Sequence, residues 1–308
     1  MRALPDKRVR IRRGWTECCT PFGVGFARRS AIAAVSLGLL AAAPARAQWT
    51  EELHVPAATH PAPSGAPTAI VHAPRELDGS APIHVVVFLH GWSGCARVLA
   101  YPGQVRCHAR DREHEGWDLI GRFDEAHVNA LFIIPQLAYE VRDGSAGRLL
   151  EPGHFRVLLD QILDGARRAH PFDGTLARVT LLAHSAGYES ALAVLSRGGV
   201  ERELRDVVLF DALYRGHQPF GEWALGAPER RLVSLHTGNG RPVRQCELLV
   251  ALVRRGMPPS EVVVDPPPNA RFARGRVIVG RSPAPHGEVP ARHLAEILRA
   301  FAERDGAR

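Results

Sequence analysis

The amino-acid sequence predicts an α/β fold in which a mostly parallel sheet carries helices on both faces. Several strand-like segments are almost wholly apolar, as strands covered on both faces must be. From residue 67 onward these segments alternate with segments of helical periodicity, and this alternation is typical of a doubly wound sheet. A chain of 308 residues with 45% apolar content can bury the core of one sizeable domain.

The apolar runs predict seven strands, bounded by turn-forming or polar residues. They span residues 68–74, 84–90, 130–136, 178–184, 206–211, 231–237 and 276–280. Helical segments are expected between them at 117–127, 155–170, 186–198, 243–256 and 288–304.

Two of these helices have a distinct apolar stripe. In the first, 155–170, the stripe is expected to contain Val157, Leu158, Ile162 and Leu163. In the second, 288–304, it is expected to contain Leu294, Ile297, Leu298 and Phe301. Both helices should pack against the sheet through these stripes.

The positive charge of the chain is confined to its first 47 residues. This segment holds nine Lys/Arg and two Asp/Glu, whereas the rest of the chain holds 30 of each. The remaining surface therefore has no general attraction for polyanions, and nucleic acid is excluded as a partner.

The N-terminal segment has the pattern of a secretory signal. Arg28 and Arg29 precede an apolar run at 31–43, and Ala45 and Ala47 form an A-x-A cleavage site. Paired arginines favour the twin-arginine export route. The run is too short to span a bilayer comfortably, so no stable membrane span is expected after processing. A buried N-terminal helix and a retained leader that anchors the protein are the alternatives.

The chain is accordingly divided into a signal peptide at 1–47, an extended Pro/Ala-rich lead-in at 48–67 and a catalytic domain at 68–308. The protein is expected in the periplasm or secreted. Of the cysteines after the leader, Cys95 and Cys107 fall in one connection and are the favoured disulfide pair, which leaves Cys246 free.

No cofactor or metal site is predicted. The cysteines form no CxxC pair, and the histidines lack HExxH-type spacing. The sequence also contains no P-loop, and no GxGxxG follows a strand, so nucleotide binding is unsupported.

One junction in the sequence carries the strongest chemical signal. In "VTLLAHSAGYESALAVL" (179–195) a strand-like run changes to helical periodicity at Ser185, which has small neighbours on both sides. A sharp strand-turn-helix junction needs small residues because the two backbones approach closely. The serine oxygen would then lie above the strand tip, near the positive end of a helix. An ordinary N-cap serine is the alternative.

This junction resembles the nucleophile elbow of the α/β-hydrolase family, G-x-S-x-G, with Ala183 in place of the first glycine and Gly187 as the second. The resemblance covers roughly residues 68 to 304 and implies that Ser185 is a nucleophile. "VVVFLHGWSG" likewise resembles the family's oxyanion segment. By that resemblance the backbone N–H groups of Trp92 and Ala186 form the oxyanion hole.

The resemblance also implies a general base and an acid. His286 follows the last predicted strand, where the family carries its base, whereas the competing His293 lies within a helical pattern. Many members carry the acid after the strand that here ends at Thr237, but that loop has no carboxylate. Asp211, one strand earlier, is therefore the expected acid, and Asp265 is a poorer candidate.

The expected function is that of a serine hydrolase that cleaves a carboxylic ester on a small-molecule or acyl substrate. A peptidase or amidase with the same triad, and a non-catalytic binding module on the same scaffold, are the alternatives. The connections 94–129 and 212–230 should border the site. Residues expected to bind the substrate are His90, Gly91, His184 and Tyr214. The sequence makes no prediction about oligomeric state.

Overall fold

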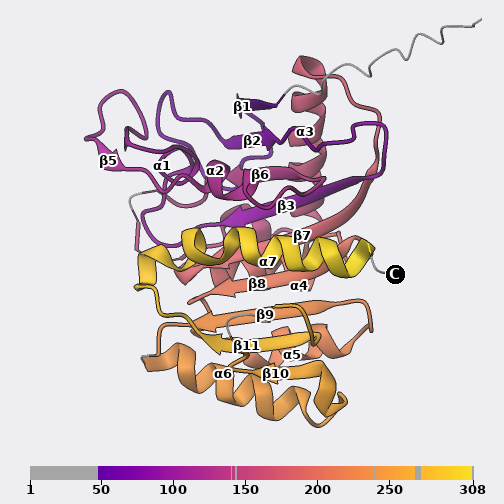
Figure 1. Cartoon of the computed structure of the whole chain (residues 1–308). Helices are drawn as coiled ribbons and strands as arrows, with labels where there is room; N and C mark the ends of the chain where they lie inside the picture. The colour runs from indigo at the N-terminus through magenta and orange to yellow at the C-terminus, as the bar shows by residue number, and fades with distance from the viewer. Residues whose placement is uncertain (1–47, 140, 143, 239, 268–271, 307–308) are drawn as a thin grey trace, which may run out of the picture. The chain divides into compact units, whose positions relative to one another are not determined.

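The structure, a computed structural model, describes residues 48–306 except 140, 143, 239 and 268–271 (Figure 1). The predicted signal peptide at 1–47 lies outside the described residues. In the part of the chain that the structure describes, no helix has the length and apolarity that a bilayer crossing requires.

Nine strands form one sheet in the order β1-β2-β6-β3-β7-β8-β9-β11-β10. β2 is antiparallel to both of its neighbours, and all the other pairs are parallel. The strands are β1 Trp49–Leu53, β2 Ala69–Ala73, β3 Ile83–Leu89, β6 Leu131–Pro135, β7 Leu176–His184, β8 Leu204–Phe210, β9 Arg231–His236, β10 Val262–Val264 and β11 Val277–Arg281. A separate ladder joins β4 (Gln104–Val105) to β5 (His114–Glu115).

All seven predicted strands are present, and their ends differ from the prediction by no more than two residues. β2 and β6 are buried along their whole length, which explains why they read as continuous apolar runs. Two strands at the edges of the sheet are additional. β1 lies in the segment expected as an extended lead-in, and β10 precedes Asp265.

Helices cover both faces of the sheet, as predicted. They are α1 Ala96–Ala100, α2 Leu119–Asp124, α3 His154–Ala169, α4 Tyr188–Arg197, α5 His217–Leu225, α6 Gly240–Val253 and α7 Val289–Gly306. One core cluster holds the buried faces of α3, α4, α5 and α6, and the other holds those of α1, α2 and α7. Figure 1 shows α7, in yellow, crossing one face of the sheet.

The predicted stripe of α7 is confirmed, since all four of its residues are buried. The stripe of α3 needs one correction, because Val157 is 47% exposed. The buried face of α3 centres instead on Phe155, Leu159, Ile162 and Ala166. At about 100° per residue Val157 points roughly away from this face.

A disulfide joins Cys95 and Cys107, with a Cα–Cα distance of 5.9 Å, and confirms the predicted pairing. Cys246 is free and buried, as predicted. Burial raises the pKa of its thiol to about 11, so the thiol stays protonated near neutral pH.

A buried charge cluster ties together the amino ends of β7, β8 and β9. Asp206 of β8 is fully buried and accepts hydrogen bonds from Arg178 Nη2 at 2.6 Å and Arg231 Nε at 2.5 Å. Thr180 Oγ1 donates a further bond at 2.8 Å, and Asp305 of α7 pairs with both guanidinium groups. Each buried charge therefore has an opposite charge in contact.

Candidate active site

Ser185 stands at the sharp turn between β7 and α4. Its φ of +54° lies in the left-handed region that non-glycine residues rarely adopt. A short 3-10 turn, Ser185–Gly187, leads directly into α4. A Cβ at Gly187 would lie 2.3 Å from the Leu89 carbonyl oxygen, so only glycine permits this approach of the turn to β3. The predicted strand-turn-helix junction is therefore present, with its small residue where the backbones meet.

The turn after β3 passes directly beside this serine. A Cβ at Gly91 would lie 2.7 Å from Ser185 Cβ and 3.2 Å from Ser185 Oγ. The Gly91–Trp92 backbone therefore borders the hydroxyl group, as the predicted oxyanion segment requires. Ala186 opens the turn into α4, where the first N–H groups of a helix lack an intrahelical acceptor.

Asp211 and His286 meet at the same edge of the sheet. His286 Nδ1 donates to Asp211 Oδ2 at 2.7 Å, although 75 residues separate the two in sequence. The carboxylate is almost fully buried, whereas the imidazole is 42% exposed. With Nδ1 bound to the acid, the other ring nitrogen, Nε2, is the one left to accept a proton.

Thr237, at the end of β9, holds the carboxylate of Asp211. Its backbone N–H donates to Oδ1 at 3.1 Å and its hydroxyl donates to Oδ2 at 2.9 Å. Burial opposes ionisation of Asp211, but the bonds from His286 and Thr237 outweigh it and hold the pKa of the carboxyl below its usual value. Thr237, in the loop after β9, thus holds the carboxylate of Asp211, which follows the neighbouring strand β8.

His184 connects the serine turn to the His286 loop. Its Nε2 donates to the His286 carbonyl oxygen at 2.9 Å, and the two rings lie 4.6 Å apart. Burial lowers the pKa of His184 to about 3, so the ring is neutral. His184, which is predicted to bind substrate, therefore uses this ring nitrogen to hold the loop that carries His286.

His90 has a similar internal role. The Leu137 backbone N–H donates to its Nε2 at 2.9 Å, and its Nδ1 donates to the Gly91 carbonyl oxygen at 2.9 Å. Burial lowers its pKa to about 4. These bonds anchor the turn that carries Trp92 to the end of β6. In the structure this side chain faces the protein interior and not the pocket expected for a substrate contact.

The strand order and the strained serine together decide the fold. The second strand is antiparallel, the central strands are parallel, and Ser185 follows the fifth strand of the main sheet in chain order. Asp211 and His286 follow Ser185 later in the chain and meet at the same edge of the sheet. This is the α/β-hydrolase fold. Within it, the sequence-predicted residues Ser185, Asp211 and His286 follow three strands whose carboxyl ends share one edge.

Comparisons with solved structures give α/β-hydrolase-fold proteins at low identity. A ferulic acid esterase is 13% identical, with a TM-score of 0.49 over 77% of this chain and 91% of that chain. An S-formylglutathione hydrolase from Agrobacterium tumefaciens is 10% identical, with a TM-score of 0.47 over 83% and 95%. A feruloyl esterase module from Clostridium thermocellum is 10% identical, with a TM-score of 0.46 over 80% and 92%. No family profile and no curated protein matches the chain.

The Ser185 side chain interacts with Tyr214 in this α/β-hydrolase fold. Burial raises the pKa of Tyr214, and the interaction with Ser185 opposes this rise. No hydrogen bond joins Ser185 Oγ to His286 among the residues that the structure describes. Rotation about the Cα–Cβ bond of Ser185 would change which side chain its hydroxyl faces. Catalytic hydrogen bonds are often long or misaligned before substrate binds.

A pocket of about 300 Å³ opens beside the serine. Aromatic side chains of Trp92, Tyr188 and Tyr214 line it together with charged side chains of Glu189, Arg215 and Arg241. Trp92 is 57% exposed, an unusual position for a large apolar ring. Of these residues, sequence analysis singled out Trp92 and Tyr214 only. The sequence feature that indicates Arg215 and Arg241 is their position in the segments that follow β8 and β9, at the edge of the sheet that carries Ser185.

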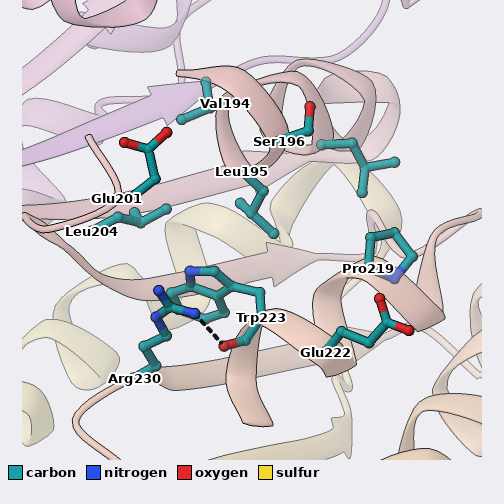
Figure 2. A pocket seen from close by; sticks show the side chains of 10 residues that line it. Val194, Leu195, Ser196, Glu201, Leu204, Pro219, Glu222, Trp223 and Arg230 are labelled. Carbon is teal, nitrogen blue, oxygen red and sulfur yellow. Dashed lines mark hydrogen bonds between the residues drawn. The ribbon is translucent and has the colours of Figure 1, made fainter. Parts of the chain in front are cut away.

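A second pocket has a volume of about 280 Å³ and lies near the amino ends of β8 and β9. Figure 2 shows the side chains that line it. It lies between α4 and α5, where Leu195, Leu204 and Trp223 give it an apolar wall. Arg230 lies 5.5 Å from the Trp223 ring and donates to its carbonyl oxygen. This pocket lies away from Ser185, Asp211 and His286, none of which lines it.

The rival acid and base are held elsewhere. His293 is buried in α7 and hydrogen-bonds with Ser282 Oγ at 3.0 Å, and Asp265 accepts from the Arg281 backbone N–H at 3.0 Å. Neither side chain contacts Ser185 or the Asp211–His286 pair among the contacts of the described residues. Those residues also contain no group of three metal-binding side chains arranged around a common point.

Proposed function

We propose that the protein is a serine hydrolase that cleaves a carboxylic ester by acyl transfer to Ser185. The observation that carries this proposal is the 2.7 Å bond between His286 and Asp211 at the sheet edge that also holds the strained Ser185. A serine hydroxyl is a poor nucleophile near neutral pH, so it needs an adjacent base. His286, oriented by a buried ionised acid, can serve as that base.

In the proposed reaction, Ser185 Oγ turns toward His286 Nε2, loses its proton to the imidazole and attacks the carbonyl carbon. Asp211 stabilises the imidazolium that forms. The negative oxygen of the tetrahedral intermediate accepts hydrogen bonds from the backbone N–H groups of Trp92 and Ala186. Each such donor typically lowers the barrier by about 3 kcal/mol.

The leaving alcohol departs with the proton that His286 holds. Water then attacks the acyl-serine ester, with His286 again taking a proton, and the carboxylic acid is released. The atoms and protons balance without a cofactor. An ester is the proposed substrate because an alkoxide leaves more readily than an amine.

Labelling with a fluorophosphonate probe tests this proposal. The probe should label the intact protein, and Ser185→Ala should abolish the labelling together with ester hydrolysis. Ser190, a buried serine of α4, provides the matched control, since Ser190→Ala should still be labelled. Well-folded protein that the probe does not label would instead favour a non-catalytic binding module.

We further propose that the protein is exported, as the leader pattern predicts. The Cys95–Cys107 disulfide supports this, because such bonds persist in oxidising compartments and are rare in reducing ones. The mass of the mature N-terminus tests the proposal. Cleavage near Gln48 is the expected result, and a mature chain that retains residues 1–47 after expression in an exporting bacterium would contradict it.

A further inference from the structure

The pocket at Ser185 is lined by two arginines that have no acidic partner in the part of the chain that the structure describes. Arg215 lies just before α5, and Arg241 lies in the first turn of α6. No carboxylate among the described residues forms an ion pair with either guanidinium group. Both guanidinium groups are exposed, whereas the half-buried Arg178 and the buried Arg231 both contact Asp206. Two unpaired guanidinium groups on one pocket wall are available for a ligand.

The described residues that line the pocket carry a net positive charge. Glu189 is the one carboxylate among them, and it accepts a hydrogen bond from the Tyr188 hydroxyl at 3.0 Å. Burial and Glu189 raise the pKa of Tyr188, whereas the charges of Arg215 and Arg241 oppose this rise. The N-terminus of α6 adds a partial positive charge on the side of Arg241.

Arginine binds carboxylate, phosphate and sulfate groups through a rigid fork of N–H donors. We propose that Arg215 and Arg241 form a subsite for an anionic group of the ester, carried close to the scissile carbonyl. The aromatic rings of Trp92 and Tyr214 would cover the atoms that link the anion to the ester. This inference rests on the proposed function and names its substrate class.

The anion could belong to the acyl half or to the alcohol half of the ester, and matched substrates distinguish the two. Three aryl esters differ in the charge of the acyl half. The first carries a neutral butyryl group, the second carries a succinyl group with a free carboxylate, and the third carries an aminobutyryl group with a positive charge. A further pair tests the alcohol half of the ester: the acetate of a hydroxybenzoate, which is anionic, is compared with the acetate of the uncharged phenol. The measurement is kcat/KM for each ester at low and at high salt.

We expect one anionic ester to exceed its neutral match in kcat/KM by about tenfold, with the preference shrinking at high salt. The double substitution Arg215→Gln/Arg241→Gln should reduce this ratio at least about fivefold. Arg244→Gln, which removes an exposed arginine of α6 that does not line the pocket, is the matched control and should retain the ratio. Fluorophosphonate labelling of Ser185 verifies that each variant keeps a formed site.

Equal rates on neutral and anionic esters, a faster reaction with the aminobutyryl ester, or an unchanged ratio in the double variant would overturn the subsite. In each case the observed ester hydrolysis would still support the proposed function. A protein that hydrolyses none of these esters and resists the probe would overturn both proposals.

Discussion

Two aspartates of one strand, five positions apart, have opposite surroundings. Asp206, near the start of β8, contacts two arginines and a threonine in the interior. Asp211, just past its end, contacts a threonine and a half-exposed histidine. Permanently charged partners fix the first acid as part of the scaffold. The second acid has a partner that can gain and lose a proton, as the proposed reaction requires.

The largest effect on the rate of ester hydrolysis should come from Asp211→Asn. An amide in place of the carboxylate cannot stabilise an imidazolium and favours the wrong tautomer of His286, so kcat should fall by about 10⁴. Steady-state ester hydrolysis measures this fall. The free energy of unfolding, from urea denaturation, should change by only about 1 kcal/mol. A large loss of stability with retained activity would reverse the roles given to the two acids.

Asp206→Asn should show the converse. The substitution leaves the guanidinium of the buried Arg231 without its closest charge, and breaking a buried pair typically costs about 3 kcal/mol or more. Urea denaturation measures this cost, and hydrolysis per folded molecule should remain near that of the parent. A variant of full stability would show that the cluster at the amino ends contributes little to folding.

A smaller effect is expected for Thr237→Val, which removes one of the hydrogen bonds to Asp211 and preserves the shape of the side chain. Because Thr237 acts through Asp211, it is a positioning residue. We expect kcat to fall by roughly three- to tenfold with little change in KM. Thr237→Ser restores the hydroxyl and should recover most of the rate, whereas a purely structural role would leave the serine variant equally impaired.

The pH dependence of stability should separate the acids by sign. The pKa of folded Asp211 is depressed, so its contribution to stability is present above the unfolded value, near 3.8, and is lost as pH falls further. Burial raises the pKa of Asp206 to about 6, so its contribution is full below the unfolded value and declines as pH rises toward 6. Below pH 4 the difference in free energy of unfolding between the parent and Asp211→Asn should therefore narrow, and an unchanged difference would contradict this prediction.

Much of the fold could be predicted because the central strands are covered on both faces and leave continuous apolar runs in the sequence. β1 was missed because "WTEEL" is half-buried and carries two glutamates, which is typical of an edge strand but not of a core one. α5 was missed because Pro219 and Gly221 interrupt its helical pattern. Local sequence carries little information where tertiary contacts decide the structure.

The site residues likewise divide into those that the sequence predicts and those that it does not. Ser185, Asp211 and His286 could be placed because each follows a recognisable strand, and the strand ends share one edge. Thr237 could not be assigned a role, since its value depends on the carboxylate of a neighbouring strand. The sequence likewise does not reveal that His184 uses its ring nitrogen on a loop 102 residues away. Contacts between distant segments require the fold before they can be read.

The positive φ angles of Ser185, +54°, and Asp211, +44°, have a consequence for protein engineering. Such conformations cost about 1–3 kcal/mol each in non-glycine residues, and glycine adopts them freely. Random mutagenesis screened for heat resistance alone would therefore reward Ser185→Gly, a change that stabilises the fold and removes the proposed nucleophile. Any campaign to make this chain more thermostable must test turnover in every round.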